Sequence, residues 1–363
     1  MTIERIELNN YRNYTRAQVE PCPGITVFIG PNAQGKTNLL EAVYLCCTGR
    51  SHRTRVDRQL IRWESDRARV HIVCRRKDGP HEVEILLDPQ EKKQVRVGGK
   101  SIARSGELMG HVNGVLFAPE DLRMVKDGPA ERRRFLDMEL SQISPAYYYN
   151  LQRYNRALKQ RGALLRTGSA SVAQLDVWDG QLCTWGAKIM LARRDFIIRL
   201  GERAGKIHDG ISGGKEALRC EYKTQVAPDK PEDALRESLA EELLRAREED
   251  LRRQISTVGP HHDDMVLKLN GTDVRAFGSQ GQQRTCALSM KLSELQVMRD
   301  ATGEYPVLML DDVMSELDPE RRRQLLGQLD GVQTMITCTD LEDLAGAPVG
   351  RRYRVENGSV REA

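Results

Sequence analysis

The stretch FIGPNAQGKTNLLEA, residues 28–42, decides how the rest of the chain is interpreted, because its glycine-rich loop lies between a strand-like segment and a helix-like segment. GITVFI, residues 24–29, is short, β-branched and apolar, which predicts a buried strand. Apolar residues then recur at helical spacing over 39–44. Between these flanks, the spacing G-x-x-x-x-G-K-[ST] is met by Gly30, Gly35, Lys36 and Thr37.

This strand–loop–helix order is the one that binds the phosphates of a nucleoside triphosphate. Glycines let backbone N–H groups approach the phosphates, and the helix N-terminus adds the positive end of its dipole. We expect Lys36 to reach the β and γ phosphates and the hydroxyl of Thr37 to bind Mg²⁺. The residues expected to contact the nucleotide are Gly30, Pro31, Asn32, Ala33, Gln34, Gly35, Lys36, Thr37 and Asn38.

A second apolar strand is predicted far along the chain, where YPVLML, residues 305–310, precedes Asp311 and Asp312. An acidic residue at the end of a buried strand holds Mg²⁺ in many P-loop proteins. We therefore expect Asp311 to bind the metal and Asp312 to orient or activate the attacking water. Most of the chain separates the two motifs, so a large segment is inserted between the halves of one domain.

A third motif, FGSQGQQRTCALSMKLSELQ at 277–296, begins with a small polar loop and continues as an amphipathic helix. The N-terminus of that helix is a further anion site. It could serve a second phosphate, or a single nucleotide held between two copies of the chain. The loop residues are Ser279, Gln280, Gly281 and Gln282. Shortly after the second strand, Asp318 and Pro319 predict another helix start.

The segment between the motifs shows two kinds of pattern. Residues 67–102 alternate apolar and polar side chains, with a Gly-Gly turn, and predict a small antiparallel sheet. Residues 129–210 and 231–253 are helical in pattern, and RTGSAS at 166–171 predicts a turn.

Three other clusters have an ordinary explanation and a functional one. Arg132–Arg134 fits a solvated helix face, although it could contact phosphates. Tyr147–Tyr149 fits a helical core better than base stacking. Residues 261–264, HHDD, have metal-ligand types but not a useful metal spacing.

Composition excludes some classes of protein. The formal net charge is +4, which neither proves nor excludes a nucleic-acid partner. The eight cysteines form no C-x-x-C pair, which favours reduced thiols. The charged N-terminus does not look like a signal peptide and no apolar run reaches membrane length, so we expect a cytoplasmic protein.

The order of these motifs resembles the ATP-binding-cassette (ABC) ATPase head, and more narrowly the RecF family of bacterial recombinational repair, related to SMC and Rad50. The resemblance is carried by five stretches: LNNYRNY at 8–14, GRSHRT at 49–54, FAPEDLRMVKDGPAERRRFLD at 117–137, VGPHHDD at 258–264 and LDDVMSELD at 310–318.

The resemblance implies an α/β fold, in which both chain ends, 1–130 and 255–363, form a P-loop ATPase head. A mainly helical arm lobe, 131–254, is inserted between them. It also implies ATP and Mg²⁺ as cofactors, with Asp311 as the metal carboxylate and Asp312 as the catalytic acid. Arg12 would lie against adenine, and Ser279–Gln282 would be the signature loop that reaches the γ-phosphate of a second subunit.

The function implied is an ATP-dependent homodimer that binds DNA and is released by slow hydrolysis. With RecO and RecR, such a protein helps load RecA at gaps or stalled forks, in replication restart and the SOS response. A P-loop phosphotransferase acting on a small acceptor is the alternative. Two departures from the family pattern stand out: the signature loop reads Ser-Gln-Gly-Gln, and the usual catalytic Glu is Asp312.

Overall fold

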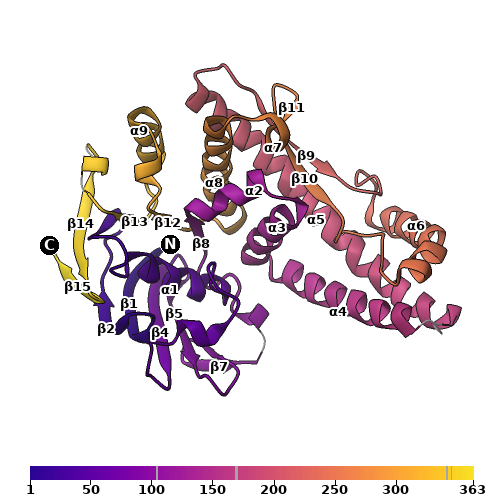
Figure 1. Cartoon of the computed structure of the whole chain (residues 1–363), viewed down its shortest axis with the longest axis horizontal. Helices are drawn as coiled ribbons and strands as arrows, with labels where there is room; N and C mark the ends of the chain where they lie inside the picture. Colours follow the sequence, from indigo (N-terminus) through magenta and orange to yellow (C-terminus); the bar gives the residue numbers. More distant parts are fainter. Residues whose placement is uncertain (104, 168–170, 341, 345) are drawn as a thin grey trace. The chain divides into compact units, whose positions relative to one another are not determined.

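The computed structural model describes residues 1–103, 105–167, 171–340, 342–344 and 346–363 (Figure 1). The chain forms two compact units. The first unit contains Met1–Asp121 and Leu288–Ala363, and the second contains Leu122–Ala287. Both ends of the chain therefore combine in one unit, as the split motifs require. The turn expected at 166–171 lies partly outside the described residues.

The first unit is mostly β-structure around one central helix. Its strands are β1 (Thr2–Tyr11), β2 (Tyr14–Val19), β3 (Ile25–Ile29), β4 (Ala68–Arg76), β5 (Gly79–Leu87), β6 (Gln94–Val97), β7 (Lys100–Ile102), β8 (Gly114–Phe117), β12 (Val307–Asp311), β13 (Thr334–Cys338), β14 (Val349–Glu356) and β15 (Ser359–Glu362). Its α-helices are α1 (Lys36–Thr48), α9 (Pro319–Gly327) and most of α8 (Gln280–Thr302), which begins in the second unit.

The second unit is mainly helical. Its helices are α2 (Leu122–Lys126), α3 (Pro129–Ile143), α4 (Pro145–Thr167), α5 (Val172–Ser212), α6 (Glu232–Arg253) and α7 (Val274–Phe277). Its strands are β9 (Leu218–Lys223), β10 (Asp264–Leu269) and β11 (Thr272–Asp273), which form a sheet of order β11-β10-β9. The boundary between the two units therefore differs from the predicted one. Residues 255–287 were expected in the ATPase head, but β10 pairs with β9, which places them in the helical unit.

A six-stranded sheet of order β15-β14-β3-β13-β12-β8 positions the candidate site. Strands β14, β3, β13, β12 and β8 run parallel, and only the β14–β15 pair is antiparallel. The carboxyl ends of parallel strands share one edge, where open α/β sheets bind their ligands. The glycine loop follows β3, and Asp311 is the last residue of β12, with Asp312 directly after it. The single strand β13 therefore separates the two predicted motifs.

The second sheet of this unit has the order β2-β1-β4-β5-β6-β7 and is antiparallel throughout, as the alternating pattern of 67–102 predicts. Its β1 strand contains a register shift between Ile3 and Arg5. This irregularity lets Ile3 and Ile6, three positions apart, both face the core.

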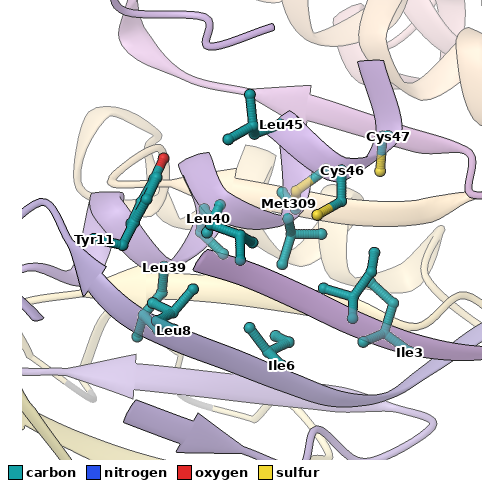
Figure 2. Packing of buried hydrophobic residues seen from close by; sticks show 14 of the residues in the cluster. Ile3, Ile6, Leu8, Tyr11, Leu39, Leu40, Leu45, Cys46, Cys47 and Met309 are labelled. Atoms are coloured by element: carbon teal, nitrogen blue, oxygen red, sulfur yellow. The ribbon is translucent and has the colours of Figure 1, made fainter. Parts of the chain in front are cut away.

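Helix α1 is buried and joins the first unit's two sheets into one core. Its side chains Leu39, Leu40, Leu45, Cys46 and Cys47 are fully buried. Figure 2 shows side chains of α1 in one cluster with side chains from β1 and with Met309 of β12. Most residues of α1, Glu41 among them, are buried, so the helix is enclosed on nearly all sides and does not present only one apolar face to the core. The core therefore fixes the start of α1, where the phosphate loop ends.

The second unit is held together by buried ion pairs, and here the solvated face expected for Arg132–Arg134 was wrong for Arg132, whereas Arg134 is exposed. Arg132 is neither a solvated residue nor a free phosphate ligand: its Nε and Nη2 donate to the two carboxylate oxygens of Asp264 at 2.7 and 2.9 Å. Arg133 donates to the backbone oxygen of Asp263. Asp264 begins β10 and Asp263 immediately precedes it, too far along the chain for a helical pattern to reveal them.

The HHDD segment has a structural role that its sequence did not indicate. Nδ1 of His261 lies 2.6 Å from the hydroxyl of Tyr154, and burial lowers the pKa of His261 to about 4. Asp263 accepts a hydrogen bond from Tyr222. The segment thus links α4, β9 and the buried arginines. Tyr147 is buried with them, which confirms the core assignment for Tyr147, but Tyr149 is 43% exposed, so the assignment of the whole cluster to the core was wrong there.

Arg161 forms the most deeply buried ion pair of this unit. Its guanidinium, fully buried, donates to Asp179 and to Asp250 at 2.5 Å each. Asp250 also accepts hydrogen bonds from the backbone N–H and the hydroxyl of Thr257. Helices α4, α5 and α6 are therefore joined through one arginine.

We predict that Asp250→Ala destabilises the second unit by about 3–5 kcal/mol, because it leaves the buried guanidinium short of a partner. Asp233→Ala, which removes an exposed 3.4 Å pair with Arg236 on the same helix, should cost less than about 1 kcal/mol. Urea unfolding followed by the fluorescence of Trp178 and Trp185 measures both. Equal midpoints for the two variants would contradict the assigned role.

Candidate nucleotide-binding site

The phosphate loop is braced by the chain around it. The side chain of Asn13 and the backbone N–H of Gly358 both donate to the carbonyl oxygen of Gln34, at 2.8 and 3.3 Å. The hydroxyl of Tyr14 donates to the carbonyl of Gly35 at 2.9 Å. These contacts come from both ends of the chain, so the loop takes its shape only when the two ends have folded together.

Two glycines of the loop are required by geometry. A Cβ at Gly30 would lie 2.1 Å from the backbone oxygen of Val355, so β14 could not approach as it does. Gly35 has a φ of 117°, and a Cβ there would lie within 3 Å of Asn13 and Tyr14. Ala33 also adopts a positive φ of 65°. The exposed backbone of Pro31, Asn32 and Ala33 leaves the outer side of the loop open to a ligand.

Lys36 lies at the centre of this loop. Its ammonium group donates to the carbonyl oxygens of Gly30 and Pro31 at 2.6 and 2.8 Å. Burial lowers the pKa of Lys36. The nearby carboxylates of Asp312 and Asp311 act in the opposite direction, because they favour the charged ammonium. The ammonium is thus held inside the loop where phosphate oxygens are expected.

The two predicted motifs meet in one hydrogen bond. Oγ1 of Thr37 donates to Oδ1 of Asp311 at 2.9 Å, although 274 positions separate the two residues. Thr337, on the strand between them, donates to the same carboxylate oxygen at 2.7 Å. Burial raises the pKa of Asp311, while the hydrogen bonds from Thr337 and Thr37 favour its ionised form.

These oxygens fit a magnesium ion. Mg²⁺ binds oxygen ligands at about 2.0–2.1 Å in an octahedron, so neighbouring ligands lie about 2.9 Å apart. Oγ1 of Thr37 and Oδ1 of Asp311 are 2.9 Å apart. A hydroxyl, a carboxylate and phosphate oxygens form the hard donor set that Mg²⁺ prefers. Thr37 and Asp311 would therefore hold the ion, which would neutralise part of the charge of the triphosphate.

Asp312 follows in an unusual backbone conformation. Its φ is 53°, in the left-handed region that Asp tolerates better than most residues. Its N–H donates to Oγ1 of Thr337 at 2.9 Å, and its carbonyl accepts from the hydroxyl of Ser315. This turn of the chain separates Asp312 from Asp311, which is buried, and leaves Asp312 half-buried at the same edge of the sheet.

Arg12 is committed to a partner that the sequence analysis missed. Its Nε and Nη2 donate to the two oxygens of Glu41, at 2.7 and 2.6 Å, and Glu41 is fully buried on α1. Burial opposes ionisation of Glu41, but hydrogen bonds from Arg12 and Ser51 hold its pKa below the ordinary value. The guanidinium is therefore oriented before any ligand binds.

Two further residues were missed. Thr337 contacts both aspartates, as described above. His52 has two buried ring nitrogens for which the described part of the structure provides no hydrogen-bond partner. Burial lowers its pKa, and the carboxylates of Glu41 and Asp311 are among the groups that act against this. The stretch GRSHRT was singled out by resemblance, but no spacing rule assigned a role to its histidine.

The predicted signature loop lies in the second unit. Ser279 and Gln282 form a reciprocal cap at the start of α8: the Ser279 hydroxyl accepts from the Gln282 N–H, and the Gln282 side chain accepts from the Ser279 N–H. Ser279 and Gln280 are exposed, and Gly281 is half-buried. Just before them, Phe277 is 77% exposed. This loop is a rigid, solvent-facing helix start.

The site and the two-unit fold together define an α/β P-loop ATPase head of the ABC type. Three comparisons agree with this. The family model described as the RecF/RecN/SMC N-terminal domain matches residues 2–355. The chain is 43% identical, over 95% of both chains, to the DNA replication and repair protein RecF of Alkaliphilus oremlandii.

Solved structures show the same likeness. The recombination mediator protein RecF–ATP of the RecFOR pathway superposes with a TM-score of 0.93 at 34% identity, covering 99% of this chain and 97% of that one. The SMC head domain of Pyrococcus furiosus superposes with a TM-score of 0.59 at 14% identity, covering 99% of this chain and 95% of that one. This likeness shows only that the two share a fold. The chain belongs to the RecF family. Among its described residues, no helix is both long and apolar enough to cross a bilayer.

We predict that Thr337→Val weakens Mg²⁺-dependent ATP binding about tenfold, because it removes the hydroxyl that orients Asp311 and accepts from Asp312, at a cost of about 1–2 kcal/mol. Thr334→Val, at the other end of β13, removes a buried hydroxyl whose partner is the backbone oxygen of Val332. It should leave ATP binding unchanged. Calorimetric titration distinguishes them, and equal affinities in both variants would refute a positioning role for Thr337.

Proposed function

We propose that the protein is an ATP-gated DNA clamp of recombinational repair. ATP with Mg²⁺ occupies the site at Lys36, Thr37 and Asp311, two copies dimerise around the nucleotides, and the dimer holds DNA until slow hydrolysis releases it. The observation that carries the proposal is the hydrogen bond from Thr37 to Asp311, which joins the two halves of a nucleotide site at one sheet edge. Membership of the RecF family supports the biological setting.

The dimer part of the proposal rests on the signature loop. Its helix start presents the exposed residues Ser279 and Gln280 at the positive end of the α8 dipole, a surface that attracts an anion. Phe277 beside it is largely exposed, and large exposed apolar side chains mark contact surfaces. We infer that this surface meets the γ-phosphate bound by a second copy, with Phe277 covered by the same contact.

The hydrolysis part rests on Asp312. A carboxylate must come within hydrogen-bond distance of the attacking water to act as a base, and Asp is one methylene shorter than the usual Glu. Because half of the hydrolytic site comes from the partner copy, turnover is slow and depends on dimerisation. Slow turnover suits a clamp, which must persist while RecO and RecR help load RecA at gaps or stalled forks. The same lifetime suits a role in replication restart and the SOS response.

Ser279→Arg should bind ATP as a monomer and fail to dimerise, because the long cation blocks the approach of the second nucleotide. Loss of the helix cap by itself lowers the free energy of unfolding by about 0.5–2 kcal/mol. Ser171→Arg, which removes the equivalent cap of α5, is the matched control and should dimerise normally. Light scattering with ATP and Mg²⁺ measures this. ATP-dependent dimers of Ser279→Arg would exclude the proposed arrangement.

Asp312→Asn should retain ATP binding, lose ATP turnover and form a long-lived dimer on DNA. In the native protein, the ATPase rate per subunit should rise with protein concentration and with added DNA, because the complete site needs two copies. Asp330→Asn, an exposed substitution elsewhere in the first unit, should leave both properties unchanged. A rate independent of protein concentration, or a short-lived Asp312→Asn dimer, would remove support for the clamp.

A further inference from the structure

Helix α4 carries an unbalanced positive charge. Its sequence, PAYYYNLQRYNRALKQRGALLRT, contains no acidic residue, and all its charged side chains are basic. One of these, Arg161, is buried and paired with Asp179 and Asp250. The four that remain, together called the α4 basic face, are Arg153, Arg156, Lys159 and Arg166.

The α4 basic face is a continuous side of the helix. All four side chains are exposed. Arg153, Arg156 and Lys159 recur at three-residue steps and Arg166 follows seven positions later, all outside the buried stripe of Tyr154, Ala157, Arg161 and Leu165. At a rise of 1.5 Å per residue, positions 153–166 extend along about 20 Å of helix axis. Figure 1 shows α4 as a long helix of the second unit, beside α5.

These cations are not part of a surface ion-pair network. Within the described part of the chain, none of the four forms an ion pair with a carboxylate. Helix α6 of the same unit shows the contrast, since its exposed arginines are paired with acids three or four positions away: Arg236 with Asp233, Arg245 with Glu241 and Glu242, and Arg252 and Arg253 with Glu249. A solvated helix face looks like α6, whereas α4 leaves its charge uncompensated.

Aromatic rings lie at the N-terminal end of the α4 basic face. Tyr149 is 43% exposed and meets Trp185 of α5 edge-on, with ring centroids 5.9 Å apart. The guanidinium of Arg153 lies over the Tyr149 ring at 4.9 Å, and the ammonium of Lys188 lies over Trp185 at 5.5 Å. Tyr149 is the exposed ring of this pair, and Trp185 is half-buried; accessible rings beside cations are the combination that contacts both the phosphates and the bases or sugars of nucleic acid.

We propose that the α4 basic face, with Tyr149 and Trp185 at its end, is the surface of the second unit that binds the DNA backbone. This rests on the proposed function and assigns its DNA contact to particular residues. A row of cations along about 20 Å complements a row of phosphates, because duplex DNA carries one negative charge per about 1.7 Å of its axis. Such a contact is independent of base sequence, since contacts to phosphates carry no sequence information directly.

The test compares two triple variants of equal charge change, both with ATP and Mg²⁺ present. Arg153→Gln/Arg156→Gln/Lys159→Gln removes three cations of the α4 basic face, and Arg236→Gln/Arg252→Gln/Arg253→Gln removes three from α6. Fluorescence anisotropy of a labelled duplex, over a series of salt concentrations, gives the affinity and its salt dependence.

For the α4 variant we expect the negative slope of log affinity against log salt to become shallower by about 2.7, which is about 0.9 for each lost phosphate contact. The affinity should fall roughly 100-fold near 0.1 M salt. ATP binding and thermal unfolding should match the native protein, because all three side chains are exposed. The α6 variant should lose far less affinity and keep the native slope.

Native slope and affinity in the α4 variant, while the native protein binds DNA, would overturn the inference and leave the proposed function intact. Equal losses in the two variants would also overturn it, by showing only a net-charge effect. Unchanged DNA binding with loss of binding to an acidic protein would assign the face to that protein instead. Failure of the native protein to bind DNA would refute both proposals.

Discussion

The site of this protein depends on one buried carboxylate, Asp311, that is held by two hydroxyl groups from distant parts of the chain. Thr37 and Thr337 both donate to its Oδ1, and parallel pairing of β3, β13 and β12 sets the spacing of the three residues. Because side chains alternate across a strand, a one-residue slip of β13 would turn Thr337 away from Asp311. The register of the sheet therefore also fixes the relative positions of Thr37, Thr337 and Asp311.

The second unit solves a different physical problem. Its long helices carry many arginines, and the buried ones are each matched by a carboxylate from another element, as Arg132 is by Asp264. Breaking such a pair costs far more than an exposed pair contributes, so the pairs fix how the helices pack. The exposed arginines of α6 are paired with acids on the same helix, whereas the α4 basic face forms no ion pair within the described residues. We therefore propose the α4 basic face and the exposed loop at Ser279 as contact surfaces of this unit.

Local patterns in the sequence predicted the strand–loop–helix at Lys36, the strand before Asp311, the antiparallel sheet of the first unit and the cap at Asp318, because each is encoded within a few neighbouring residues. What the sequence could not predict are pairings between distant residues. Thr337 and Glu41 matter only through strand register and helix packing, which no periodicity reveals. For the same reason Arg132 was expected on a solvated face, and residues 255–287 with the head, although β10 pairs within the helical unit.

The central claim is that Thr37 and Asp311 hold Mg²⁺ beside a nucleotide on Lys36. Its most direct test is calorimetric titration of ATP into the native protein and Asp311→Asn, each with Mg²⁺ and with EDTA. The account predicts that Mg²⁺ tightens ATP binding to the native protein and gives no such gain to Asp311→Asn, while the affinity in EDTA is similar in both. An undiminished gain from Mg²⁺ in Asp311→Asn would contradict it.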